Sequence, residues 1–293
     1  MTQQLSAENI FASISNGYYH FTVAEKKVAE YVLGHKDEVQ FLSISELADE
    51  CGVAEATISR FCRRLKLKGY NAFKLAVAKA VAGEQRGNMP GDEDQAHGVV
   101  REGSVLELGH QLHAAQTAAI TQSLALLRAD KIEQAVDLLC GAERIYCMGQ
   151  GGSMIMAMVA ANQFSTVSPR FFAVQDSHQQ VSTAALLSSD EVVLYFSYSG
   201  STKELMELAN VVKGSGAKLI LVTRFSKSPG AALADVVLQC GSNEGPLQLG
   251  SMPAKMAQLF VVDVLFHEYI RRAPELARQS QERIADALAE KHL

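Results

Sequence analysis

Short runs of β-branched and other apolar residues alternate with longer runs of helical character between residues 144 and 238. Parallel strands need a crossover connection of about a dozen residues or more, and a helix usually provides it. The alternation therefore predicts an α/β domain built on a doubly wound, mainly five-stranded parallel sheet that is flanked by helices. The expected strands are Arg144–Met148, Arg170–Val174, Val192–Ser197, Lys218–Thr223 and Val236–Leu238. The expected helices are Val105–Leu127, Lys131–Cys140, Ser153–Phe164, Gln179–Leu187, Lys203–Lys213, Ala254–Arg272 and Glu275–Lys291.

The residues before this sheet have a different character. Residues 6–82 show the pattern of short helices, and Gly83–Ser104 is rich in glycine and in mixed charge but poor in apolar side chains. We therefore expect an all-α domain over residues 1–82, a linker over residues 83–104 and the α/β domain over residues 105–293. No apolar run reaches the ~20 residues of a membrane span, and the five cysteines form no Cys-x-x-Cys pair. The expected location is the cytoplasm, with no membrane partner and no metal site.

Positive charge is concentrated in one segment of a chain whose net charge is −5. Residues 56–79 hold seven lysines and arginines and no acidic residue. Such a local excess indicates a polyanionic partner for this segment alone. A solvated helix face is the alternative that charge density by itself leaves open.

The same segment follows a helix-turn-helix pattern over Glu46–Phe61. The small residue Ala48 is followed four positions later by Gly52, where a tight turn needs a positive φ or close packing. Ile58 and Phe61 then lie three residues apart on the second helix and face inward. Two helices that cross steeply need this spacing, although an ordinary helical hairpin is the alternative. The second helix and the turn after it supply the candidate DNA contacts Thr57, Ser59, Arg60, Arg63, Arg64 and Lys68.

A glycine-rich loop follows the first expected strand. Gly149 and Gly151 precede Ser153, where the next helical run begins. Glycines at a strand-to-helix turn allow backbone N–H groups to approach an anion at the helix N-terminus. A simple tight turn and a dinucleotide loop are alternatives, but a full Gly-x-Gly-x-x-Gly is absent because residue 154 is Met. We expect no dinucleotide and no other cofactor.

Hydroxyl side chains cluster after the third expected strand. Four serines and threonines and one glycine stand before the helix that starts at Lys203, namely Ser197, Ser199, Gly200, Ser201 and Thr202. Their hydroxyls can donate to phosphate oxygens, and the glycine lets the backbone wrap an anion. An N-capped helix is the alternative, although capping needs only one hydroxyl. Because the carboxyl ends of parallel strands share one edge of a sheet, we expect both loops to line one phosphate-binding crevice.

Together these segments resemble the RpiR (MurR/RpiR) family of transcriptional regulators, in which a helix-turn-helix domain precedes a sugar isomerase (SIS) domain. The matching segments are Ala24–Ala29, Ser45–Ala48, Gly52–Val53, Ala56–Cys62, Lys68–Lys74, Gly149–Ser153, Asp176–His178, Ser197–Thr202, Ala234–Val237 and Met256–Leu265. The resemblance implies a regulator of carbohydrate-metabolism genes that binds operator DNA as a homodimer or homotetramer and responds to a sugar phosphate. It places phosphate contacts at Ser153, Ser197, Ser199 and Thr202, and an acidic residue near the sugar at Glu244.

Two residues depart from the family pattern. Ala54 stands where the family usually has a serine that caps the second helix, and Lys66 replaces a usual glycine in the following turn. A lost cap costs about 1 kcal/mol, and Lys66 adds a charge near the expected DNA backbone. Neither departure changes the expected function.

A phosphosugar isomerase or etherase would use the same phosphate loops and is the alternative function. It would also need an acid or base near the sugar, for which the candidates are Glu244, His178, Asp176 and Lys255. No pair of these has a diagnostic spacing, and a DNA-binding domain gives catalysis no obvious role. We therefore expect no catalytic residues and no enzyme activity.

Overall fold

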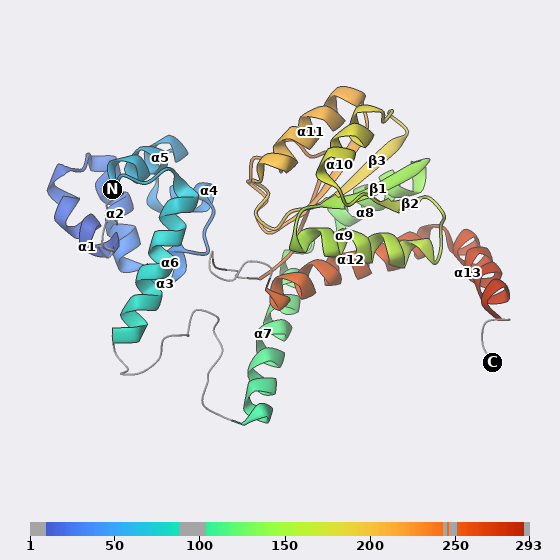
Figure 1. Cartoon of the computed structure of the whole chain (residues 1–293), viewed down its shortest axis with the longest axis horizontal. Helices are drawn as coiled ribbons and strands as arrows, with labels where there is room; N and C mark the ends of the chain where they lie inside the picture. Colours follow the sequence, from blue (N-terminus) through green and yellow to red (C-terminus); the bar gives the residue numbers. More distant parts are fainter. Residues whose placement is uncertain (1–9, 88–103, 243–244, 246–250, 290–293) are drawn as a thin grey trace, which may run out of the picture. The chain divides into compact units, whose positions relative to one another are not determined.

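The computed structural model describes residues 10–87, 104–242, 245 and 251–289. The chain divides into two compact units, a helical N-terminal one and a C-terminal one that contains the sheet (Figure 1). Separate clusters of buried apolar side chains form the cores of the two units. Among the described helices, none is long and apolar enough to cross a membrane.

The described part of the N-terminal unit is all-α, as the sequence predicts. Its α-helices are α1 (Ile10–Gly17), α2 (Val23–Gly34), α3 (Lys36–Val39), α4 (Ile44–Cys51), α5 (Glu55–Arg64) and α6 (Tyr70–Gly87). Leu47, Ile58 and Phe61 are fully buried in its core, so the inward spacing of the second helix is confirmed. Helix α6 ends at Gly87 and so occupies the first five residues of the expected 83–104 linker. Residues 88–103 of that linker lie outside the described residues.

The turn between α4 and α5 has the geometry that a glycine permits. Gly52 adopts a left-handed conformation with φ 59°, and its N–H bonds back to the end of α4. Lys66, in the turn after α5, has a φ of 61°. A side chain in this region costs roughly 1–2 kcal/mol, so replacing the family's glycine there carries a backbone cost.

Two of the N-terminal helices begin with reciprocal capping boxes, and α5 does not. Thr22 pairs with Glu25 at α2, and Ser43 pairs with Glu46 at α4. Ala54, at the start of α5, has the extended conformation of a cap residue (φ −77°, ψ 148°) but makes no side-chain hydrogen bond. The helix predicted to bind DNA therefore lacks the side-chain cap that its neighbours have.

Replacing Ala54 by serine is expected to raise the free energy of unfolding of the N-terminal unit by about 1 kcal/mol. The new hydroxyl can accept from a backbone N–H in the first turn of α5, which now has no side-chain acceptor from this position. Calorimetry of the full chain should show the N-terminal transition rising by about 4–8 °C. Ala56→Ser is the control, since Ala56 is exposed in the same turn but is not at the cap. An equal rise in both variants would contradict the capping explanation.

The C-terminal unit contains the five-stranded parallel sheet that the sequence predicts. The strands occur in the order β2-β1-β3-β4-β5, and every described pairing is parallel. Their ends lie within one residue of the predicted ones. The strands are β1 (Arg144–Gly149), β2 (Phe171–Ala173), β3 (Glu191–Phe196), β4 (Lys218–Thr223) and β5 (Val236–Gln239). The helices described after residue 103 are α7 (Val105–Leu126), which the C-terminal unit includes from Leu112 onward, α8 (Ala129–Gly141), α9 (Gly152–Ser165), α10 (Ser177–Ala185), α11 (Lys203–Ser215), α12 (Met252–Arg272) and α13 (Pro274–Ala289).

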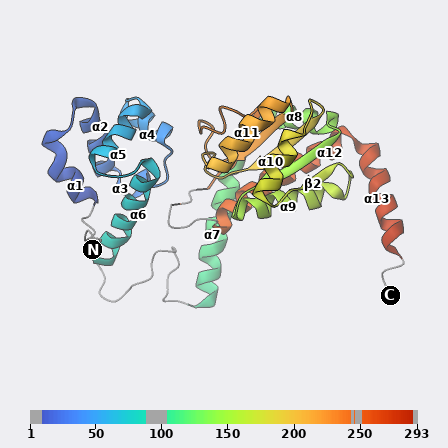
Figure 2. The ribbon, with the colours of Figure 1, turned by 45° about the horizontal axis from the view of Figure 1, so that its top comes forward.

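Helices cover both faces of this sheet. Side chains of α8, α9 and α12 pack on the face that contains Leu194 and Phe196, and those of α10 and α11 pack on the face that contains Val193 and Tyr195. Figures 1 and 2 show α9 and α12 along one face and α11 on the other. Because both faces are buried, every residue of β3 is buried, which explains its apolar run from Val192 to Phe196.

The neighbouring strands β1 and β3 mark the point where the winding direction changes. The chain leaves β1 for α9 on one face of the sheet and leaves β3 for α11 on the other. The two strands pair directly up to Gly149 and Phe196. Ligands of open α/β sheets bind at such a switch point, at the carboxyl ends of the strands. The two predicted phosphate loops both begin there.

Candidate DNA-binding helix and effector site

The candidate DNA contacts on α5 and in the turn after it are mostly at the surface. Arg60, Arg63 and Lys68 are exposed, and Ser59 is half-buried. Arg60 and Arg63 lie three residues apart, so they share one side of the helix. This side offers guanidinium groups that can reach phosphates or base edges.

Thr57, which the sequence offers as a candidate DNA contact, does not lie on the outer side of α5. Its side chain is only 5% exposed. With 3.6 residues per turn, Thr57 falls on the same inward stripe as Ile58 and Phe61. Its hydroxyl accepts a hydrogen bond from the Arg60 guanidinium at 3.3 Å. Thr57 can therefore orient Arg60, but it is not itself presented at the surface.

Arg64 is engaged within the N-terminal unit. Its guanidinium lies 3.4 Å from the Glu25 carboxylate, whose side chain is only 6% exposed. It also donates to the backbone carbonyl of His20. These contacts join the end of α5 to α2 and the turn before it. Lys74, another member of the basic segment, is half-buried, and burial lowers the pKa of its ammonium group to about 8. The seven positive charges are therefore not one uniform DNA-facing surface.

The loop after β1 has a backbone that only glycine accommodates. A Cβ on Gly149 would lie 3.0 Å from the carbonyl oxygens of Phe196 and Ser153. Gly151 has φ 54° and ψ −125°, which an L side chain rarely adopts. It precedes α9, which has no side-chain cap, and Ser153 is half-buried in the first turn. The 14-residue helix thus presents an N-terminus suited to an anion.

The hydroxyls of the loop after β3 organise the loop itself. The buried Ser197 accepts from the N–H of Gly200 at 3.2 Å, and Ser199 accepts from the N–H of Ser201 at 3.3 Å. Thr202 caps α11 by accepting from the N–H of Leu205 at 3.4 Å. Of these hydroxyls, that of Thr202 therefore has the alternative role of a helix cap. A hydroxyl that accepts one N–H still has its own proton to donate to a phosphate oxygen.

Gly200 is the tightest point of this second loop. Its φ is 60°, and a Cβ there would lie 2.0 Å from the Ser228 hydroxyl and 2.9 Å from that of Thr223. Both neighbours are buried. The loop can therefore keep its shape only if residue 200 has no side chain.

Gln180, which no pattern in the sequence singles out, is 1% exposed and connects this edge of the sheet. Its amide nitrogen donates to the carbonyls of Gly149 (3.0 Å) and Val174 (2.8 Å). Its amide oxygen accepts from Gln150 at 2.9 Å. One glutamine in a helical run has no spacing that identifies it, so only the fold reveals this role.

The candidates for the alternative enzyme are not assembled into an acid–base pair in the described residues. Asp176 caps α10 by accepting from the N–H of Gln179 at 2.9 Å, and His178 is exposed. Lys255 is half-buried in the first turn of α12. Glu244 lies outside the described residues.

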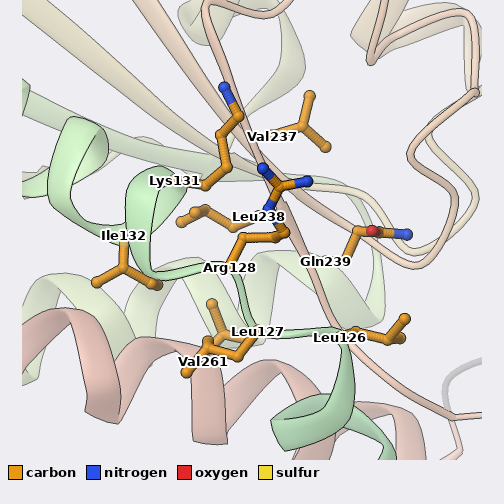
Figure 3. A pocket seen from close by; sticks show the side chains of 9 residues that line it. All are labelled: Leu126, Leu127, Arg128, Lys131, Ile132, Val237, Leu238, Gln239 and Val261. Carbon is orange, nitrogen blue, oxygen red and sulfur yellow. The ribbon is translucent and has the colours of Figure 1, made fainter.

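A small hollow beside β5 contains none of the predicted ligand residues (Figure 3). Its cationic groups already have partners, because Arg128 pairs with Asp130 at 3.0 Å and Lys131 donates to Gln134 at 3.0 Å. The other lining side chains are Leu126, Leu127, Ile132, Val237, Leu238, Gln239 and Val261. The hollow therefore does not replace the switch point as the candidate anion site.

Comparison with known proteins agrees with this two-part architecture. The model of the rpiR-family helix-turn-helix domain matches residues 8–84, and that of the SIS domain matches residues 138–268. An uncharacterized HTH-type transcriptional regulator of Caldanaerobacter subterraneus is 34% identical over 258 residues, which cover 88% of this chain and 89% of that protein. The chain belongs to the RpiR family of helix-turn-helix transcriptional regulators.

Other relatives of this RpiR-family chain are similar over their whole length. The HTH-type transcriptional regulator HexR of Escherichia coli is 30% identical over 287 residues, covering 96% of this chain and 95% of that protein. The structure of Vibrio vulnificus NanR, described as complexed with ManNAc-6P, matches with a TM-score of 0.82 at 24% identity, covering 96% and 98% of the two chains. The latter similarity shows a shared fold.

Proposed function

We propose that this RpiR-family regulator binds a sugar phosphate between β1 and β3, and that the bound ligand changes its affinity for operator DNA. The observation that carries the proposal is the convergence of two anion-suited loops, Gly149–Ser153 and Ser197–Thr202, at the switch point of the sheet. The same chain contains a helix-turn-helix domain, so ligand binding has a DNA-binding output. The ManNAc-6P in the NanR structure supports a phosphorylated sugar as the ligand class.

In this proposal both loops contact the phosphate. Ser197, Ser199, Ser201 and Thr202 donate hydroxyl protons, and Ser153 adds another from the first turn of α9. Gly149, Gly151 and Gly200 keep the backbone close enough for its N–H groups to take part. The N-termini of α9 and α11 supply favourable dipoles. Glu244, which lies outside the described residues, is proposed to contact the sugar.

On the DNA side, Ser59, Arg60, Arg63 and Lys68 are proposed to contact the operator. Thr57 is proposed to orient Arg60 as a buried hydrogen-bond acceptor. Arg64 is proposed to act through its ion pair with Glu25. A homodimer or homotetramer would place two α5 helices on half-sites about 34 Å apart. A ligand that binds one spacing of these helices better than another shifts the operator affinity.

A regulatory role is favoured over the isomerase or etherase alternative. Asp176 is used as a helix cap and His178 lies at the surface, whereas proton transfer needs a group held within hydrogen-bond reach of the substrate. The named relatives are transcriptional regulators. We therefore propose that the chain does not turn over its ligand, and that it acts in the cytoplasm, where the DNA is.

The test is a ligand panel with two readouts on the full chain. Melting temperature is measured with hexose, pentose and amino-sugar phosphates, ManNAc-6P included, each beside its unphosphorylated sugar. A ligand at 100 times its Kd adds about 2.7 kcal/mol, which raises the melting temperature of a unit of this size by roughly 5–10 °C. Fluorescence anisotropy with DNA fragments selected from a random library then measures the change in DNA affinity.

We expect one sugar phosphate to raise the melting temperature and to change the DNA affinity, while its free sugar does neither. If no sugar phosphate raises the melting temperature, the proposal of a sugar-phosphate site is wrong. Conversion of the sugar phosphate to product, followed by NMR, would instead support the enzyme.

A further inference from the structure

A buried hydrogen bond joins α7 to the segment that follows β5. Ser123, on α7, is fully buried, and its hydroxyl accepts from the backbone N–H of Gly241 at 2.8 Å. The same hydroxyl donates to the carbonyl of Ala119, one turn earlier, at 2.8 Å. The two segments pack closely, because a Cβ on Gly241 would lie 2.5 Å from the backbone nitrogen of Ser123. A displacement of Gly241 must therefore displace Ser123 or break this bond.

The next residue, Ser242, is held by the loop after β3. Its carbonyl accepts from the Tyr198 hydroxyl at 2.7 Å and from Nε of Arg224 at 3.2 Å. Tyr198 belongs to the Ser197–Thr202 loop, and its own carbonyl accepts from the N–H of Arg224 at 3.1 Å. The proposed phosphate loop is therefore connected to α7 through two consecutive residues, Gly241 and Ser242.

The backbone of Ser242 is strained. Its φ is 147°, although it is not a glycine and is buried. Residues with a side chain rarely adopt this region, and they persist there only where the surrounding contacts hold them. The two hydrogen bonds to the Ser242 carbonyl are contacts of this kind. A shift of Tyr198 therefore acts on a residue that its neighbours keep in an unfavourable conformation.

Helix α7 can convert a small shift at Ser123 into a larger one at its other end. The division between the two compact units falls within α7, after Gln111. Of its 22 residues, all of which the structure describes, only Ala119 and Ser123 are buried. At about 1.5 Å per residue, the start of the helix at Val105 lies about 27 Å from Ser123, so a tilt of about 5° moves that end by about 2 Å.

We infer that the Tyr198–Ser242 and Gly241–Ser123 hydrogen bonds form a relay, through which ligand binding at the Ser197–Thr202 loop repositions α7 and so changes operator affinity. The inference rests on the proposed function and adds the route by which one site affects the other. Tyr198 and Ser123 are positioning residues in this relay, since neither needs to touch the ligand or the DNA.

The test measures the ratio of DNA affinities with and without ligand, by fluorescence anisotropy on the full chain. The ligand is the sugar phosphate with the largest thermal shift in the panel, at a saturating concentration. In Ser123→Ala we expect this ratio to fall toward 1, by about 3-fold or more. Isothermal titration calorimetry should show that this variant still binds the sugar phosphate. A role in stability alone would lower the melting temperature and leave the ratio unchanged.

Tyr198→Phe tests the other bond of the relay without depending on the stability of Ser123→Ala. It removes one hydroxyl, and Arg224 still donates to the Ser242 carbonyl, so the fold is retained. The ratio should fall as in Ser123→Ala. The double variant should fall no further than the single ones, because both bonds belong to one connection.

Thr121→Ala is the matched control on the same helix. Thr121 is exposed, and its hydroxyl donates to the carbonyl of Thr117 at 2.9 Å. The variant thus loses the same kind of bond within α7 as Ser123→Ala but keeps the bond to Gly241. Its ratio of DNA affinities should equal that of the wild type.

A wild-type ratio in both Ser123→Ala and Tyr198→Phe would overturn the relay and leave the proposed function standing. An equal fall in Thr121→Ala would also overturn the relay. A wild-type chain that binds no sugar phosphate would overturn both.

Discussion

Replacing Gly200 by alanine is expected to abolish the response to the sugar phosphate and to lower the free energy of unfolding of the C-terminal unit by about 2–4 kcal/mol. The added Cβ would lie 2.0 Å from the Ser228 hydroxyl and 2.7 Å from its Cβ. The left-handed φ of 60° adds a conformational cost for any L side chain. The loop must then move, and its hydroxyls leave the positions from which they reach a phosphate. Urea unfolding and the thermal-shift panel measure the two effects.

Gly214→Ala is the matched control for this variant. Gly214 lies in α11, the helix that follows the same loop, and a Cβ there would meet nothing within 4 Å. Alanine in a helix is favoured over glycine by up to about 1 kcal/mol, so this variant should be slightly stabilised and respond normally. DNA binding without ligand should be preserved in both variants, because the helix-turn-helix unit has its own core. A Gly200→Ala chain that responds like the wild type would show that this loop is not the effector site.

Replacing Arg63 by alanine is expected to lower operator affinity by roughly 5–100-fold, the range of one base or phosphate contact. Arg63 is exposed on α5 beside Arg60. If it binds a phosphate, the salt dependence of binding should also fall by about one unit of slope; if it binds a base, sequence preference should relax instead. Anisotropy titrations at several salt concentrations, with a selected and a scrambled DNA, distinguish the two.

Replacing the adjacent residue, Arg64, by alanine is expected to have a different effect from replacing Arg63. Arg64 pairs with the nearly buried Glu25 and with the backbone of His20, so Arg64→Ala should lower the melting temperature of the N-terminal unit. Arg63→Ala should leave that temperature unchanged. Equal DNA affinity in Arg63→Ala and the wild type would remove Arg63 from the interface. A DNA defect in Arg63→Ala that follows a loss of stability would make its role structural.

Local sequence patterns were sufficient to predict the helices and strands and to locate the two loops after β1 and β3. The buried strands are almost continuously apolar, as β3 shows, and glycine or hydroxyl residues mark the strand-to-helix turns after β1 and β3. These signals act over a few residues, so they can be read without knowing what packs against them. The inward spacing of Ile58 and Phe61 on α5 is of the same kind.

The strand order and the roles of individual side chains required the tertiary structure. That β1 lies beside β3, and so brings the two loops together, depends on pairing between segments about 50 residues apart. Thr57 looked like a surface hydroxyl in the sequence but is buried, and Arg64 looked like its neighbour Arg63 but is tied to Glu25.

Gln180 and Tyr195 show the same limit most clearly. In sequence they are a polar residue in a helical run and an aromatic residue in a strand. In the fold, the first holds the edge of β1, and the second is fully buried on β3, where its hydroxyl has no hydrogen-bond partner among the described residues. Propensity and spacing determine which elements form, because they are set by neighbouring residues. The partner of each polar atom is decided only when distant segments pack together.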